Sequence, residues 1–244
     1  KTFFRFHPGR LNKLIKLMKK PIITIIIFFQ TSLLYSQEQE KKNLTMSSFS
    51  GIKVYSNIDV NLISSDVNKA IIYGHNSEYV VLSSKDKILK IRVSGGNILT
   101  PGRTKIDLYY SSPLGFIGAY QGSKINSHFP IKKTSLSIES KGGSSINIEV
   151  FCERLYTKVS FGGKAFIKGK AVNHELFFGY SGICESEKLI TQQTKCKSNG
   201  GGYAYVFATK LLEAELYGGL LRVSGRPKKI MKTERLGAKI TIEK

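Results

Sequence analysis

A glycine beside small residues returns at a nearly constant interval through the second half of this sequence. The glycines that mark the interval are Gly122, Gly143, Gly163, Gly182, Gly202, Gly219 and Gly237. Their successive separations are 21, 20, 19, 20, 17 and 18 residues. Self-similarity at a period of this length is typical of a solenoid, in which one structural unit stacks on the next. This period constrains the fold more than any other feature.

Between the glycines, apolar residues alternate with polar ones, as in a strand with one buried face. Ile146, Ile148 and Val150 give one example, and Leu176 with Phe178 another. From 120 to 244 no segment has a helical stripe. A propeller blade needs about twice this period, and a β-sandwich, the structural alternative, needs no regular period. The sequence therefore predicts an all-β fold, a single-chain parallel β-helix or β-solenoid, which we expect to be right-handed.

We interpret the seven glycines as the structural corners of this repeat. Glycine adopts left-handed or bulged backbone at little cost, and its missing side chain lets stacked turns approach each other. One unit buries too little apolar surface to fold alone, so stability belongs to the stack and its ends need caps. Residues 49–244 are predicted to form this domain, with the most regular repeats over 120–244 and an N-terminal β cap before them.

The N-terminal part of the sequence resembles an export signal. Lys19 and Lys20 precede an apolar run over 22–34, and a cleavage site is expected at Ser36 or Gln37. A transmembrane helix is disfavoured because the run is shorter than the roughly 20 residues that such a helix needs. We therefore predict a signal peptide over 18–37, an upstream over-extension over 1–17, and a flexible lead over 38–48. The protein is expected to be exported to the periplasm, outer membrane or exterior, with no transmembrane helix in the mature chain.

The chain is strongly basic, with 38 lysines and arginines against 17 acidic residues. Removal of residues 1–37 leaves 31 basic residues and a net charge of +14, carried by 25 lysines and 6 arginines. Such a charge attracts polyanions, and the excess of lysine favours diffuse attraction over bidentate recognition. The partner predicted is an acidic polysaccharide or another polyanion, with no specific nucleic acid, because no nucleic-acid motif occurs. A solvated lysine-rich surface without a partner is the alternative.

The quoted runs also carry a family likeness. The opening "FSGIKV" with "IDVNL", the stretch "VLSSKDKILKI", and the closing "VSGRP" with "GAKI" frame the recurrent glycine units. In this order they resemble the putative auto-transporter adhesin, head GIN domain family, over about residues 47–244. The resemblance implies an exported β-helical domain without established catalytic residues. Two positions after the repeat glycine, where the family usually has a small residue, this chain has Cys184 and Leu221. The stretch "KSNGGGYAYVF" has one extra glycine. These departures put the local turn geometry in question.

Carbohydrate lyases and hydrolases also use β-helices, so carboxylate pairs were considered as catalytic groups. From 120 to 244 no aspartate occurs. Glu185 with Glu187 and Glu213 with Glu215 stand two residues apart on a strand face, where solvent-exposed charge opposite lysine is the simpler interpretation. His75, His128 and His174 lie singly, without the spacing of metal ligands. We therefore predict no catalytic residues, no metal site and no cofactor.

Three cysteines, Cys152, Cys184 and Cys196, form no zinc or redox motif. We interpret them as buried free thiols, with a disulfide between Cys184 and Cys196 as the alternative. The function predicted is a non-enzymatic envelope or cell-surface module, an adhesin or a glycan- or polyanion-binding protein. A carbohydrate-active enzyme that uses glutamate pairs, and a structural envelope partner held by strand pairing at an open end, are the alternatives.

Overall fold

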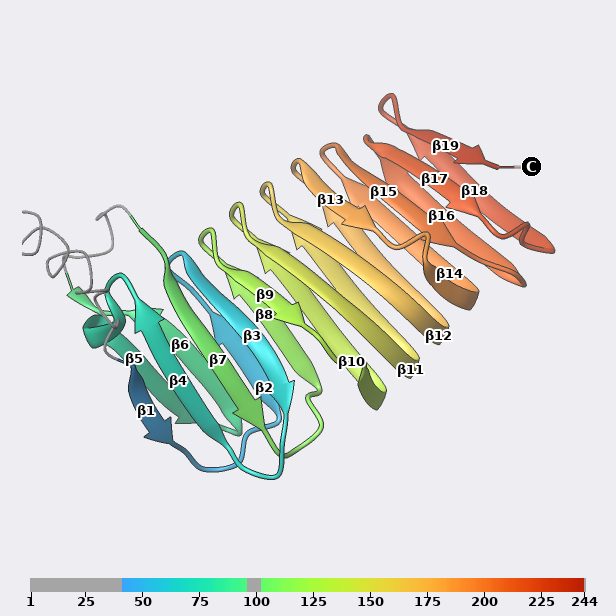
Figure 1. The fold of residues 1–244 in the computed structure, drawn as a ribbon. Helices are drawn as coiled ribbons and strands as arrows, with labels where there is room; N and C mark the ends of the chain where they lie inside the picture. Colours follow the sequence, from blue (N-terminus) through green and yellow to red (C-terminus); the bar gives the residue numbers. More distant parts are fainter. Residues whose placement is uncertain (1–40, 96–101, 244) are drawn as a thin grey trace, which may run out of the picture. The chain divides into compact units, whose positions relative to one another are not determined.

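The described part of the computed structural model comprises residues 41–95 and 102–243. Strands dominate it, no α-helix occurs among these residues, and Ser77–Tyr79 (η1) form a single 3-10 turn. From β8 (Phe116–Tyr120) onward the chain winds through stacked coils (Figure 1). The predicted parallel β-solenoid is thus confirmed, and its winding sense stays a prediction. The segments 1–17 and 18–37, the predicted over-extension and the predicted signal peptide, lie outside the described residues.

Two sheets form the walls of the solenoid and meet at the turns. In order of pairing, sheet A consists of β5 (Val80–Lys85), β6 (Ile88–Val93), β2 (Gly51–Val54), β8 (Phe116–Tyr120), β10 (Ile131–Lys141), the second halves of β11 (Ser145–Ser160) and β12 (Lys164–Gly179), β14 (Leu189–Asn199), β16 (Leu211–Tyr217) and β18 (Lys229–Arg235). Sheet B consists of β1 (Lys42–Thr45), β4 (Lys69–Gly74), β7 (Thr104–Tyr110), β3 (Ile58–Ser64), β9 (Lys124–Ser127), the first halves of β11 and β12, β13 (Gly182–Glu185), β15 (Gly202–Phe207), β17 (Leu220–Ser224) and β19 (Lys239–Ile242).

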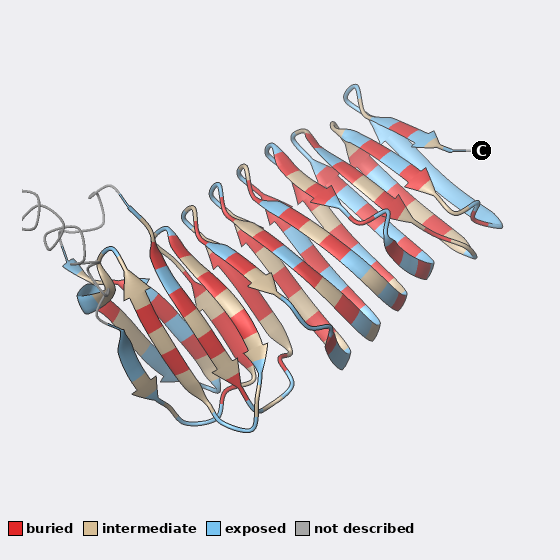
Figure 2. Ribbon diagram, in the orientation of Figure 1, coloured by how far each residue is buried: buried red, intermediate tan, exposed pale blue. Residues whose placement is uncertain are grey.

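The strand β11 shows how one coil is built. It begins at Ser145 in sheet B, bends at 151–154, and continues in sheet A to Ser160. It pairs in parallel along its length with β12, so that Ile146 lies beside Ala165. Because strand residues alternate in direction, this register stacks inward residues on inward residues. The buried positions therefore recur from coil to coil (Figure 2) and form one continuous core.

Each coil passes from sheet A to sheet B through a tight turn with two successive residues at positive φ, the pattern of a type I′ turn. In the first regular coil these are Gln121 at 53° and Gly122 at 72°. Among the predicted corner glycines, the second turn residue is Gly122, Gly143, Gly219 or Gly237. Gly163, Gly182 and Gly202 instead follow the turn by one residue. The glycines of the sequence repeat thus occupy two neighbouring positions of the coil.

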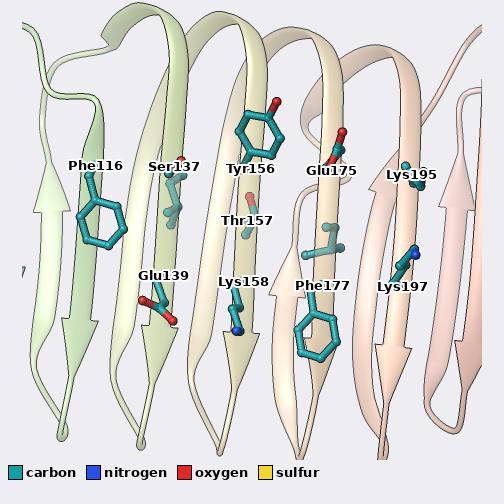
Figure 3. A pocket seen from close by; sticks show the side chains of 12 residues that line it. Phe116, Ser137, Glu139, Tyr156, Thr157, Lys158, Glu175, Phe177, Lys195 and Lys197 are labelled. Atoms are coloured by element: carbon teal, nitrogen blue, oxygen red, sulfur yellow. The ribbon is translucent and has the colours of Figure 1, made fainter.

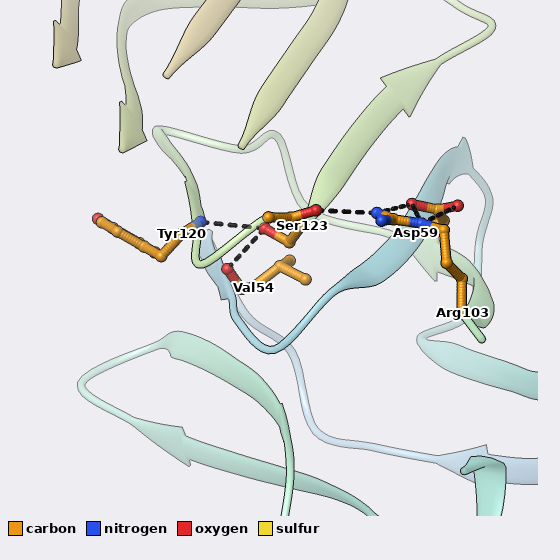
Figure 4. Close-up of polar contacts among 6 residues, drawn as sticks. Val54, Asp59, Arg103, Tyr120 and Ser123 are labelled. Atoms are coloured by element: carbon orange, nitrogen blue, oxygen red, sulfur yellow. Dashed lines mark hydrogen bonds and ion pairs between the residues drawn. The ribbon is translucent and has the colours of Figure 1, made fainter. Parts of the chain in front are cut away.

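At the second position, glycine is required by close approach of the backbones. A Cβ on Gly163 would lie 2.2 Å from the carbonyl oxygen of Ser140 in the preceding coil. The first regular coil has room for Ser123 at the same place. Its Oγ donates to the carbonyl oxygen of Val54 at 2.9 Å and accepts from the backbone N–H of Tyr120 at 3.0 Å (Figure 4). Where the spacing between coils leaves room for a side chain at this position, its hydrogen bond links two successive coils.

Antiparallel strands close the N-terminal end, where a cap was predicted. On sheet A the strand β5 pairs antiparallel with β6, and on sheet B the strand β4 pairs antiparallel with β7. Lys42–Thr45 form β1 and pair antiparallel with β4. The expectation of a flexible lead over 38–48 is therefore wrong for these four residues. The open edge of β4 offers unpaired backbone groups, which this segment satisfies.

At the C-terminal end, the edge strand of sheet A carries inward-facing charges. In β18, Lys232 and Glu234 lie beside Ala214 and Leu216, at positions that face the core in earlier coils. The two charged side chains pair with each other, Nζ to Oε1, at 3.0 Å. All seven residues of β18 are exposed (Figure 2). Inward-facing charges on an edge strand oppose the addition of another strand.

Candidate binding surfaces

The wide bends, where the chain passes from sheet B to sheet A, carry basic residues in six successive coils of the described chain. We call these residues the basic ridge: Lys132, Lys133, Arg154, Lys170, Lys188, Lys210, Lys228 and Lys229. All eight are exposed. Because neighbouring strands are about 4.8 Å apart, six coils extend over about 24 Å. In the strand register these residues fall between the position of Glu149, which Lys188 shares, and that of Arg154, which Lys229 shares. The ridge is therefore a staggered band of positive charge.

The basic ridge is not neutralised by the protein's own acids. Within the described residues, none of its eight side chains has a carboxylate oxygen within 4.0 Å. Glu153 and Glu187 lie on the same bends but form no ion pair there. On the flat face of sheet A, by contrast, Lys195 lies 3.6 Å from Glu213, and Lys197 lies 3.7 Å from Glu215. Unpaired cations thus gather on the bends.

A shallow groove of about 370 Å³ crosses the outer face of sheet A, over β8, β10, β11, β12 and β14 (Figure 3). Its lining consists of Phe116, Ser137, Ile138, Glu139, Tyr156, Thr157, Lys158, Glu175, Leu176, Phe177, Lys195 and Lys197. The parallel register places Phe116, Ser137, Tyr156 and Glu175 side by side on successive strands. Ser137 is small, so a depression lies between the rings of Phe116 and Tyr156 (Figure 3).

Glu139 is held rigidly at one side of this groove. Its carboxylate accepts a hydrogen bond from Tyr120 Oη at 2.5 Å and pairs with Lys141 Nζ at 2.6 Å. Burial alone would raise the pKa of Glu139, but the hydrogen bonds from Lys141 and Tyr120 outweigh it and lower the pKa. Burial, with the bond to Glu139, raises the pKa of Tyr120. The ring of Tyr120 also stacks on Tyr55 at 4.7 Å between centroids.

The two glutamate pairs considered as catalytic groups lie on different sheets. Glu213 and Glu215 face outward from β16 in sheet A, each beside its lysine. Glu185 ends β13 in sheet B, with Glu187 on the bend that follows. The coil geometry does not bring the pairs together. This arrangement fits solvent-exposed charge opposite lysine better than an acid and base that flank one substrate bond.

The three histidines of the described chain form no common site. His174 lies in the core beside Thr157, with Nε2 3.1 Å from Oγ1, and burial lowers its pKa to about 4. His75 and His128 are exposed on separate turns. Among residues 41–95 and 102–243, no group of three or more histidine, cysteine, aspartate or glutamate residues is placed to hold a metal ion.

The cysteines are free thiols. Cys184 and Cys196 are buried and Cys152 is half-buried, so the alternative of a disulfide between Cys184 and Cys196 is wrong in this structure. Burial raises the pKa of Cys184 to about 12 and that of Cys152 to about 11. The three behave as small core residues, and thiols with such pKa values are poor nucleophiles.

Sequence reasoning found the excess of lysine but not its placement. The signal was present, because basic residues lie within a few positions of the same core position in successive coils. A repeat aligned on core positions, from Ile131 through Val150 to Leu189, would have exposed it.

The described residues include no helix with the length and apolar character needed to cross a membrane.

Comparison with known proteins places the fold. A putative adhesin from Bacteroides fragilis superposes with a TM-score of 0.75 at 18% identity, over 85% of this chain and 98% of that one. A putative adhesin from Parabacteroides merdae gives 0.65 at 20% identity, over 86% and 98%. A putative lipid binding protein from Parabacteroides distasonis gives 0.60 at 15% identity, over 85% and 95%. No curated protein matches. At such identities the likeness establishes the fold alone.

The family itself is established by sequence. A model of the putative auto-transporter adhesin, head GIN domain matches residues 48–227. That range begins just after β1 and ends at the last wide bend, so it contains both the basic ridge up to 227 and the groove. The chain belongs to the putative auto-transporter adhesin, head GIN domain family.

Proposed function

We propose that this protein is a non-enzymatic adhesive module of the cell envelope or surface that binds an acidic polysaccharide along the basic ridge. The adhesin family to which it belongs is consistent with an exported or surface role. The observation that carries the proposal is the row of unpaired cations on six successive coils of the described chain. Desolvation of these side chains by the protein is small, so their charge is available to a ligand.

The shape of the basic ridge favours an extended linear polyanion. Each coil presents one or two cations, so charge recurs along the axis at the spacing of the strands, about 4.8 Å. A polysaccharide with an acidic group on each repeating unit can follow such a row and gain one weak contact per coil. Because lysine forms point-charge contacts, affinity comes from their number and not from any single bidentate pair.

An anionic lipid surface is the competing partner, and a structural relative is described as a putative lipid binding protein. The ridge does carry exposed apolar residues, including Phe151 and Ile190. They stand singly among the cations and do not form the continuous apolar face with which interfacial segments enter a bilayer. Single apolar residues among recurring cations therefore support a chain-like partner over a planar one.

The test is retention of the full protein on immobilised alginate or heparin as a function of salt. The ridge variant combines Lys132→Gln, Lys170→Gln and Lys210→Gln. Its matched control combines Lys124→Gln, Lys164→Gln and Lys239→Gln, which removes the same charge from exposed positions on sheet B.

We expect the protein to elute at moderate salt, the ridge variant to elute at clearly lower salt, and the control to behave nearly as wild type. Equal losses in both variants would mean that net charge alone is responsible, and retention that is insensitive to salt would reject the electrostatic basis. Binding to anionic phosphatidylglycerol vesicles without binding to either polysaccharide would assign the ridge to a membrane instead.

A further inference from the structure

The groove on sheet A has a chemistry different from that of the basic ridge. It crosses five strands, or about 19 Å at about 4.8 Å per strand, and runs along the solenoid axis. Its floor is the backbone of the sheet, with side chains standing on both sides (Figure 3). Such an open trough accommodates an extended ligand, where an enclosed pocket would select a compact one.

Tyr156 is the central aromatic group of the groove. Its side chain is 39% exposed although it stands in the middle of the sheet. In Figure 3 the rings of Phe116, Tyr156 and Phe177 present their faces toward the viewer, above the strands. Lys53 lies over Phe116 at 5.4 Å and Lys158 lies over Phe177 at 5.6 Å, measured from Nζ to the ring centroid.

Among the described residues, neither a cation nor another ring stacks on Tyr156. The face of this one ring is therefore free for a ligand. An aromatic face carries partial negative charge and attracts the weakly positive C–H groups of a flat, partly apolar molecule. The C–H face of a pyranose ring has this character.

The charges around Tyr156 balance. Lys195 and Lys197 pair with glutamates on β16, and Glu139 pairs with Lys141. This leaves Glu175, beside Tyr156 on the next strand, and Lys158, two residues further along β11, without an ion pair in the described chain.

One acceptor, Glu175, and one donor, Lys158 over the ring of Phe177, thus flank Tyr156 without an ion pair and with no net charge between them. Sugar hydroxyls both donate and accept hydrogen bonds, so they complement this pair. A polyanion would be repelled by Glu175, and a purely apolar ligand would leave both charged groups desolvated and unpaired.

We infer that the groove is a carbohydrate site for an uncharged pyranose chain, which stacks on Tyr156 and hydrogen-bonds to Glu175 and Lys158. The site is separate from the basic ridge in place and in chemistry. The protein accordingly presents two carbohydrate-binding surfaces, one selective for charge and one for the flat face of a sugar ring.

The experiment is isothermal titration calorimetry of the full protein with cellohexaose, laminarihexaose, maltohexaose and mannohexaose, each in turn. High salt in the buffer screens the basic ridge. We expect saturable binding of at least one of these neutral sugars. Tyr156→Ala should weaken it about tenfold, and Glu175→Gln severalfold. The control, Tyr203→Ala, removes a ring that is 49% exposed on sheet B and should leave affinity unchanged.

The proposal is overturned if none of the four sugars binds, or if Tyr156→Ala binds as wild type does. Equal weakening by Tyr203→Ala would also reject it, since stacking would then not be confined to the groove. Retention of Tyr156→Ala on alginate at low salt tests the ridge independently, so the failure of one proposal is distinguishable from the failure of the other.

Discussion

The buried His174 predicts how the stability of the solenoid depends on pH. In an unfolded chain the pKa of histidine is about 6.5, whereas in the fold burial lowers the pKa of His174 to about 4. Below about pH 6.5 this histidine is therefore protonated in the unfolded chain, whereas in the folded protein His174 stays neutral until about pH 4. Stability is complete above pH 6.5 and falls as the pH drops toward 4. At about 1.36 kcal/mol per pH unit, the expected loss is about 2 kcal/mol at pH 5 and about 3 kcal/mol at pH 4.

The assay is urea unfolding, followed by far-ultraviolet circular dichroism, at pH 7 and pH 5. His174→Gln keeps a polar partner for Thr157 but does not titrate, so it should lose about 2 kcal/mol less than wild type between the two pH values. His128→Gln, at an exposed turn, is the matched control and should follow wild type. The acidic residues affect all three proteins alike. If wild type and His174→Gln lose equal stability, the core histidine does not carry the effect.

Three further predictions concern the core and the ends of the stack. In urea unfolding, Gly163→Ala should lower the free energy of unfolding by about 1–3 kcal/mol, because the added Cβ would lie 2.2 Å from a carbonyl oxygen. Gly115→Ala is the control and should be nearly neutral, because the nearest atom to its Cβ would be 3.8 Å away. Lys232→Leu combined with Glu234→Leu should produce association that increases with concentration in sedimentation velocity, and an unchanged monomer would refute charge as the end block. Cys184 should resist alkylation at about pH 8 until denaturant is added, as followed by mass spectrometry, and rapid labelling of the native protein would contradict its burial.

The class of fold could be predicted from the sequence because two periods coincide in it. Alternation with period two identified strands, and the glycine interval identified their stacking. The glycine interval was less regular than the coils, because Gly143 and Gly163 occupy neighbouring positions and not equivalent ones. A single sequence cannot separate a glycine required for positive φ from one required by the close approach of two backbone segments, since both positions appear only as glycine.

The strand β1 and the candidate binding surfaces were harder to predict, because both depend on pairing between distant strands. β1 is short and polar, and only the open edge of β4 gives it a structure. Tyr156 and Glu175 are 19 positions apart in sequence and become neighbours only through the register of β11 with β12. The lysines of the ridge were counted in the net charge, but their lack of carboxylate partners depends on side-chain placement, since Glu153 and Glu187 lie on the same bends without an ion pair.

The constant register from coil to coil also bears on how such a protein can change its reach. Each complete coil from β11 to β17 meets its neighbours through the same parallel pairing, so an exact duplication of one coil would find a matching surface above and below. Internal duplication would then lengthen the row of cations by one step without redesigning any contact. Coil number in this way sets the length of the basic ridge.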